Sequence, residues 1–245
     1  MNANDPTVRI AMWSGPRNLS TAMMRAFGAR DDCAVVDEPF YAPFLAASGL
    51  DHPMRDEILA RHENDPAAVA ALCRGPAPGG AALFYQKQMT HHMLPGFDLS
   101  FMDDVKNAFL IRDPARVVAS YEVKREEPTF EDLGFVRQRE IFERVAETLG
   151  DAPPVIDSHA VLSDPRRTLG ALCGALGISF DEKMLMWTAG PHTEDGAWGP
   201  HWYGSVYRST GFGEPNLAAP VLSDHGRALA ERATPYYETL ARYAL

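Results

Sequence analysis

Short apolar runs alternate with longer amphipathic stretches along most of the chain. Each run spans four to six residues and stops beside a polar, charged or turn-forming residue, which is typical of strands buried on both faces. We expect five strands, at residues 8–13, 33–37, 81–86, 107–111 and 154–157. Helical spacing predicts helices at residues 20–30, 53–62, 64–73, 114–124, 131–149, 165–176 and 221–243. Asn64 and Asp164 are the expected N-caps of two of them, each with a proline within two residues.

This alternation predicts an α/β fold with a mostly parallel central sheet of about five strands and helices on both faces. We find no internal repeat or low-complexity linker, so residues 1–245 are expected to form a single domain. Residues 187–216 break the pattern, because they lack a period but contain three tryptophans and several glycines. A long segment of this kind is usually functional or disordered, and its aromatic content favours an ordered, functional one.

Charge narrows the class of ligand. The 245 residues have a formal net charge of −10, which argues against nucleic-acid binding and against an anionic membrane surface. A local anion site is compatible with this charge, since the first 30 residues hold four arginines and one aspartate. The sequence has no secretory signal pattern and no apolar run near 18 residues. We expect a cytoplasmic protein without membrane contact, and we expect no bound metal.

The strongest chemical signal follows the first predicted strand. Residues 14–21 read Ser-Gly-Pro-Arg-Asn-Leu-Ser-Thr and lead from a strand into a helix. Backbone N–H groups of such a turn, together with the helix dipole, bind anions. Arg17 adds a fixed charge, and Ser20 and Thr21 add hydroxyl groups. The spacing also fits a structural turn capped by Ser20. The ATP-type loop GxxxxGK[ST] is absent.

A second basic turn follows the fourth predicted strand. Arg112 stands at the end of that strand, where open α/β sheets bind ligands, and Ser120 lies eight residues further on in the next predicted helix. The guanidinium group offers a two-pronged contact to phosphate, and the serine offers a hydroxyl donor. Alternatively, Arg112 pairs with Asp113 or with a helix terminus.

Together, these two turns resemble the signature elements of the P-loop sulfotransferases. Residues 16–21 resemble the family's loop for a 5′-phosphosulfate, and the stretch from Arg112-Asp113-Pro114 to Ser120 matches its R-[ND]-P-x(5)-S element for a 3′-phosphate. The likeness extends over about residues 8–178, and the loop is similar to that of a bacterial-type branch with the core S-G-P-R-N-[IL]-S-T. The resemblance implies a P-loop NTPase-like sulfotransferase fold.

The resemblance also implies a reaction. PAPS (3′-phosphoadenosine 5′-phosphosulfate) would be the cosubstrate, and its sulfuryl group would pass by in-line displacement to a hydroxyl or amine of a small-molecule acceptor. By the same resemblance, these residues would bind the cosubstrate: Gly15, Pro16, Arg17, Asn18, Leu19, Ser20, Thr21, Arg112, Ser120 and, from a loose match to a late loop, Arg208. Three loop positions depart from the family's usual residues: Arg17 replaces a common lysine, Asn18 a serine and Leu19 a glycine. Arginine stays protonated, so Arg17 can stabilise charge but cannot move a proton.

Two places provide candidates for the base that activates the acceptor. Lys87 and His91 follow the third predicted strand and resemble the family's K-x(3)-H region. Glu38 follows the second strand and resembles an E-P-[FL] element of some bacterial members. We favour His91 slightly over His92, with Glu38 as an equal competitor. Arg17, His91, Glu38 and Lys87 are therefore the candidate catalytic residues, although a lone histidine or glutamate near a strand end is more often a surface or capping residue.

Other functions and states stay open at this level. A P-loop kinase-like phosphotransferase using ATP is disfavoured because the loop lacks lysine. A non-catalytic nucleotide-binding module of the same fold is favoured by the departures at Arg17 and Leu19. The sequence does not determine the oligomeric state, and a homodimer is one of the alternatives. Acidic residues in the segment 187–216 favour a cationic or neutral polar acceptor over an anionic one.

Overall fold

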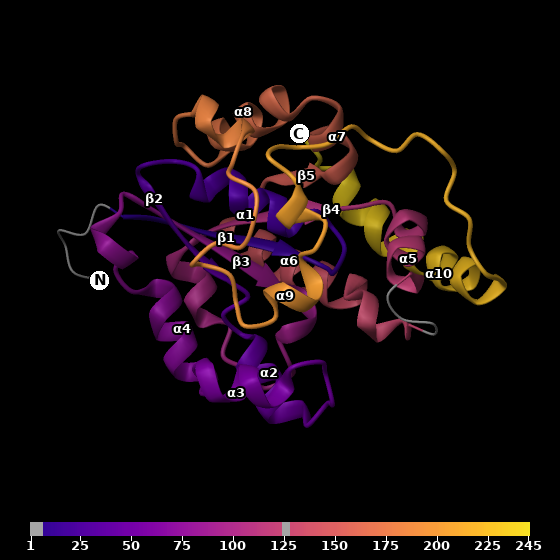
Figure 1. Cartoon of the computed structure of the whole chain (residues 1–245), viewed down its shortest axis with the longest axis horizontal. Coiled ribbons are helices and arrows are strands. Elements are labelled where there is room, and N and C mark those ends of the chain that lie inside the picture. Colours follow the sequence, from indigo (N-terminus) through magenta and orange to yellow (C-terminus); the bar gives the residue numbers. More distant parts are fainter. Residues whose placement is uncertain (1–6, 124–127) are drawn as a thin grey trace.

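The computed structural model describes residues 7–123 and 128–245, and a five-stranded parallel sheet lies at its centre (Figure 1). The strands follow the order β2-β3-β1-β4-β5 across the sheet, and every neighbouring pair is parallel. Their bounds are β1 Val8–Ser14, β2 Cys33–Asp37, β3 Leu83–Met89, β4 Lys106–Ile111 and β5 Val155–Asp157. All five strands expected from the apolar runs are present, which confirms the α/β fold.

Helices occupy both faces of this sheet. They are α1 Ser20–Gly28, α2 Tyr41–Ser48, α3 Arg55–Arg61, α4 Pro66–Arg74, α5 Pro114–Glu122, α6 Phe135–Leu149, α7 Ser158–Ser163, α8 Pro165–Ala175, α9 Gly199–Trp202 and α10 Asp224–Ala241. Ile10 and Met12 of β1 pack with α1 and α8, whereas Ala11 and Trp13 pack with α4, α6 and α10. Successive strand residues point to opposite faces, so both faces of β1 are apolar and buried.

Three helices begin at an Asp-Pro pair. The side chains of Asp65, Asp113 and Asp164 accept hydrogen bonds from backbone N–H groups in the first turns of α4, α5 and α8. Proline at the first helical position makes the preceding residue the N-cap. The expectation that Asn64 caps α4 is therefore wrong, whereas the one for Asp164 is confirmed. The helix expected at residues 114–124 is α5 as far as Glu122, and residue 124 lies outside the described part.

Some elements differ from the sequence prediction. Helix α2 was not predicted, because it is almost wholly apolar and has no helical period. The helix expected at residues 131–149 begins at Phe135, after a 3₁₀ turn at Glu131–Leu133 and the left-handed Gly134 with φ 72°. A Cβ atom at position 134 would lie 3.1 Å from Thr90 Oγ1, so both backbone angle and space favour glycine there.

The segment 187–216 crosses the molecule in front of the sheet with little regular structure, apart from α9 and a 3₁₀ turn at Val206–Arg208 (Figure 1). Trp198 and Tyr203 anchor it, because both are buried against Tyr41 and Phe44 of α2. The packing of these aromatic residues therefore fixes the position of the segment on the rest of the protein. In the described residues, no helix is long and apolar enough to span a bilayer.

Candidate functional site

A cavity of about 750 Å³ lies where the chain leaves the carboxyl ends of the strands. Its walls include residues that follow β1, β2, β3 and β4, which parallel pairing brings to one edge of the sheet. Eleven residues predicted from the sequence line it: Pro16, Arg17, Asn18, Leu19, Ser20, Thr21, Glu38, Lys87, His91, Arg112 and Ser120. Gly15 and Arg208 were also predicted, but neither is among the lining residues. Gly15 instead packs closely on the Leu133 carbonyl, where a Cβ atom would lie 2.8 Å from the oxygen.

The loop after β1 presents a helix N-terminus to the cavity. Leu19 is the N-cap residue of α1, with φ 71°, and Ser20 is the first helical residue, so the idea that Ser20 caps the helix is wrong. The first intrahelical bond runs from the Met23 N–H to the Leu19 carbonyl. The amide groups of the preceding residues, Ser20, Thr21 and Ala22, have no intrahelical partner, and all three residues line the cavity. Such an end favours an anion.

Left-handed backbone angles shape the same loop. Arg17 has φ 62° and Leu19 has φ 71°. A residue with a side chain is disfavoured in this region by about 1–2 kcal/mol relative to the right-handed one. A glycine at the position of Leu19 would avoid this cost. Strained backbone of this kind concentrates at binding and catalytic sites.

The two basic turns meet in the cavity. Arg17 donates a hydrogen bond from Nε to Ser120 Oγ at 3.0 Å, and Arg112 Nη1 donates to the Arg17 carbonyl oxygen at 2.6 Å. Asp113 is engaged as the cap of α5, where it accepts from the Arg116 N–H. Burial lowers the pKa of Arg17, and burial together with the nearby charge of Arg17 lowers that of Arg112. Two half-buried guanidinium groups this close together favour an anionic ligand between them.

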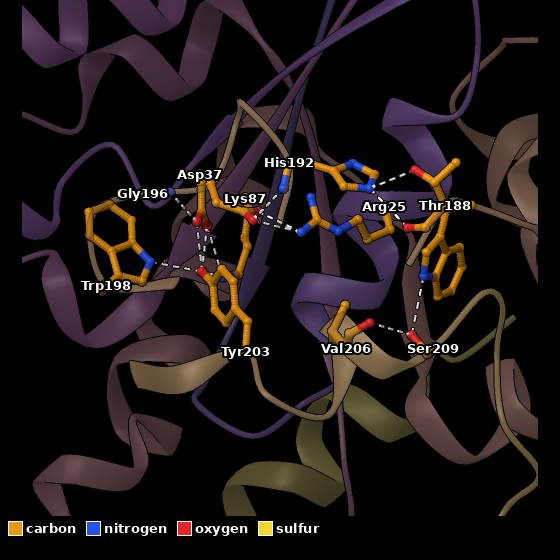
Figure 2. Close-up of polar contacts among 12 residues, drawn as sticks. Arg25, Asp37, Lys87, Thr188, His192, Gly196, Trp198, Tyr203, Val206 and Ser209 are labelled. Carbon is orange, nitrogen blue, oxygen red and sulfur yellow. Dashed lines mark hydrogen bonds and ion pairs between the residues drawn. The ribbon is translucent and has the colours of Figure 1, made fainter. Parts of the chain in front are cut away.

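A buried charged cluster lies at the same cavity as the two basic turns. Figure 2 shows Asp37, Lys87 and Tyr203 of this cluster. Lys87 Nζ donates to Asp37 Oδ1 at 2.9 Å, to Glu38 Oε1 at 2.6 Å and to Tyr203 Oη at 2.6 Å. Tyr203 Oη in turn donates to Asp37 Oδ2 at 2.7 Å and accepts from Trp198 Nε1 at 2.8 Å. An ammonium group has three donors, so every donor of Lys87 is already used.

Burial and charge set the titration of the cluster. Burial disfavours the ammonium form of Lys87, but the carboxylates of Asp37 and Glu38 outweigh it and raise its pKa. Burial raises the pKa of Glu38 despite the nearby Lys87 charge, and it raises that of Tyr203 well above the ordinary value. Lys87 therefore remains a cation that orients Glu38. The Glu38 backbone is left-handed, with φ 39°.

Two neighbouring histidines complete this part of the cavity. Burial lowers the pKa of His91 to about 4 and that of His92 well below its usual range, so both are neutral at pH 7. The His92 ring stacks on Tyr41 at 4.5 Å and on Phe44 at 5.0 Å between ring centroids. Its Nδ1 atom lies 3.9 Å from Glu38 Oε2. The Nδ1 atoms of both histidines are buried and make no hydrogen bond within the part of the chain that the structure describes.

The segment 187–216 is fastened to the site by buried charges (Figure 2). Arg25 of α1 and Asp195 form an ion pair at 2.8 Å whose side chains are 2% and 5% exposed. The Gly196 N–H donates to Asp37 Oδ2 at 3.0 Å. Arg208, from the same segment, is exposed. Asp37 and Tyr203 were not predicted as site residues from the sequence. The signals closest to them were the candidate Glu38, which is next to Asp37, and the aromatic content of the segment that contains Tyr203.

In the described ranges, no group of three or more histidine, cysteine, aspartate or glutamate side chains is arranged to hold a metal ion. The site residues are instead hydroxyl, guanidinium, carboxylate and imidazole groups around one cavity. Such a set can bind an anion with several charged oxygens, and it places a carboxylate and two neutral imidazoles nearby for proton transfer.

Known proteins resemble this chain in sequence and in structure. Two proteins of Arabidopsis thaliana, branched-chain-amino-acid aminotransferase-like proteins 1 and 2, are 40% and 37% identical over 232 residues, which is 94% of this chain. These residues make up 41% of each relative, so the chain spans about two fifths of their length. A sulfotransferase from Alicyclobacillus acidocaldarius matches with a TM-score of 0.58, covering 97% of both chains at 13% identity, and so shares the fold. The sulfotransferase domain family matches residues 8–244, and the chain belongs to this family.

Proposed function

We propose that the protein transfers a sulfuryl group from PAPS to a hydroxyl or amine of a small-molecule acceptor. The observation that carries this proposal is the meeting of Arg17, Arg112 and Ser120 with the N-terminus of α1 at one cavity. A nucleotide with a phosphate at one end and a phosphosulfate at the other needs two anion sites a short distance apart. Membership of the sulfotransferase family supports the same chemistry.

The donor groups divide between the two ends of the nucleotide. Arg112 and Ser120 would bind the 3′-phosphate, by a guanidinium fork and a hydroxyl donor. Arg17, Ser20, Thr21 and the free amides at the start of α1 would bind the 5′-phosphosulfate. Arg208 is exposed and outside the cavity wall, so a direct contact between it and the nucleotide would require the segment around it to move.

The reaction is a single displacement at sulfur. The acceptor oxygen or nitrogen forms a bond to sulfur while the bond from sulfur to the bridging phosphate oxygen breaks. The electron pair of that bond stays on the phosphate, and the bisphosphate PAP leaves. The acceptor's proton passes to a base on the protein and then to solvent. Arg17 and the α1 amides would stabilise the charge that develops on the leaving phosphate.

We propose Glu38 as that base. Its Oε1 atom is held by Lys87, and its Oε2 atom lies toward His92. Burial raises the pKa of Glu38, which makes it a stronger base than an ordinary carboxylate. His91, with a pKa of about 4, would be a weak base. Lys87 would then be a positioning residue for Glu38, since its three donors are all engaged.

Nucleotide binding tests the proposal directly. We expect PAP and PAPS to raise the melting temperature of the protein by mass action, and Mg-ATP to have little effect. Labelled PAPS mixed with a panel of alcohols and amines then tests transfer. Stabilisation by Mg-ATP alone would support a phosphotransferase instead. Binding of PAP without transfer to any acceptor or to water would support a non-catalytic module.

A further inference from the structure

Outside the arginine-bearing loops, the cavity has a second wall of different character, which we call the acceptor wall. It is built from the start of α2, the loop before α3, and α9. Its members are Tyr41, Leu50, Asp51, His52, Pro53, His201 and Trp202. We infer that this wall binds a small alcohol that carries an ammonium group, an inference that rests on the proposed function and names its acceptor.

The aromatic members of the acceptor wall support one another. Tyr41 Oη is hydrogen-bonded to His52 Nδ1 at 3.0 Å, and Trp202 packs against the apolar cluster that contains Tyr41. The rings of His201 and Trp202 meet edge-on at 4.4 Å between centroids. Tyr41 is buried and its ring stacks on His92, so it supports the wall from behind. The partly exposed Trp202 offers an indole face, which attracts cations, and quaternary ammonium groups are well-known ligands of such faces.

The charges around the cavity favour a cation on this side. Glu38, Asp51 and Asp132 line the cavity. The ammonium of Lys87 is outnumbered by the two carboxylates that hold it, so the buried cluster of Asp37, Glu38 and Lys87 is left with one negative charge. The positive charges without such compensation, Arg17 and Arg112, belong to the proposed donor site. An anionic acceptor would meet carboxylates here, whereas a cationic one is attracted by them.

An unpartnered buried atom places the hydroxyl of the acceptor. The side chain of His92 is 2% exposed, and its Nδ1 atom has no hydrogen-bond partner among the described residues. It lies 3.9 Å from Glu38 Oε2. A single oxygen can sit at about 2.8 Å from each of two atoms at this separation. An alcohol there would accept from the Nδ1–H tautomer of His92 and donate to Glu38, which an ammonium nitrogen, having only donors, cannot do.

Matched pairs of ligands isolate the ammonium group. Choline is compared with neohexanol, its uncharged carbon isostere, and tyramine with para-propylphenol. Each dissociation constant is measured by calorimetry, with and without saturating PAP. We expect at least one cationic member to bind about tenfold more tightly than its neutral partner, a difference of about 1.4 kcal/mol, which lies within the range of a cation–π contact. Equal or weaker binding of both cations, or no binding by any of the four, overturns the inference.

Variants locate the preference on the acceptor wall. Asp51→Asn and Trp202→Leu are expected to reduce the ratio between cation and isostere by about threefold to tenfold, while binding of the neutral partner changes little. Asp56→Asn is the matched control, because its side chain is fully exposed on α3 and does not line the cavity. An unchanged ratio in both wall variants contradicts the proposed location. If PAP does not bind but the cation still binds more tightly than its neutral isostere, PAPS is not the donor, and the inference of a cation site is still supported.

Discussion

The Arg17 guanidinium donates from Nε to Ser120 Oγ at 3.0 Å, across 103 residues of chain. This bond joins the loop after β1 to the helix after β4. Strands β1 and β4 are neighbours in the sheet. Arg112 adds a second link, because it holds the carbonyl of Arg17 in the left-handed conformation. The two basic turns are therefore linked into one unit, and we expect a change in one turn to affect the other.

Replacement of Arg112 by alanine tests this unit. Arg112→Ala removes a charged donor and also the support of the Arg17 carbonyl, so PAP binding is expected to weaken by about 1.5–3 kcal/mol, or roughly tenfold to a hundredfold. Calorimetry measures the change. Arg166→Ala on the exposed surface of α8 is the matched control and should bind PAP normally. Wild-type affinity in the Arg112 variant would remove the basis for the donor site.

Glu38→Gln separates the proposed base from binding. The amide keeps the shape of the side chain but cannot accept the acceptor's proton, so kcat is expected to fall by about 10²- to 10⁴-fold. The affinity for PAP should stay within a factor of about three, because Glu38 is not assigned to the donor site. Steady-state kinetics and calorimetry give the two quantities. If kcat fell little in Glu38→Gln but strongly in His91→Gln, His91 rather than Glu38 would be the base.

The buried ion pairs of Lys87 predict a large effect on stability. Lys87→Met leaves Asp37 and Glu38 as adjacent, buried and uncompensated carboxylates, so the free energy of unfolding is expected to fall by about 3–5 kcal/mol. Urea unfolding measures it. The double variant Asp37→Asn/Lys87→Met should lose less than the sum of the single variants, because the two residues are in contact. Lys183→Met, at a solvent-exposed ion pair, should change the free energy of unfolding far less.

Tyr203 fastens the segment 187–216 to the sheet. Tyr203→Phe removes a hydroxyl that accepts from Lys87 and Trp198 and donates to Asp37, all of them buried. Leaving these partners unsatisfied is expected to cost about 1–3 kcal/mol of unfolding free energy. The half-exposed Tyr243 provides a control, since Tyr243→Phe should change stability by less than about 0.5 kcal/mol. Equal costs in both variants would show that the hydroxyl network contributes nothing.

Acid should destabilise the protein through His91. The pKa of this imidazole falls from 6.5 to about 4 on burial, so the unfolded chain takes up the proton first as the pH drops. The stabilisation is complete above pH 6.5 and is lost toward pH 4, by up to about 3 kcal/mol. The pKa of Glu38 is raised in the folded state, so its contribution to stability increases as the pH falls. This contribution is present both in the wild type and in the variant His91→Gln. The free energy of unfolding is measured by urea denaturation at several pH values for the wild type and for His91→Gln, and the difference between the two should isolate the contribution of His91. Parallel curves of unfolding free energy against pH would contradict the lowered pKa of His91.

Particular elements show why some of the site was predictable. Arg17 and Arg112 each stand close behind a short apolar run, and parallel strands bring such positions to the same edge of a sheet. Leu19 differs: the sequence marks it as a departure from glycine, and the backbone angle gives the physical meaning of that departure. Arg208 was expected from a loose match and lies outside the cavity wall, because the path of an irregular segment is not encoded by any period.

The sequence by itself determined the sheet, most of its covering helices and the position of the two basic turns, since each depends on neighbours within a few residues. Only the tertiary structure decided the rest of the site. Asp37 and Tyr203 are 166 residues apart, and the ion pair between Arg25 and Asp195 spans 170. Such contacts follow from the packing of Trp198 and Tyr203 against α2, whose apolar sequence shows no helical period. Packing over long separations depends on shape and burial across the whole molecule, which no local pattern contains.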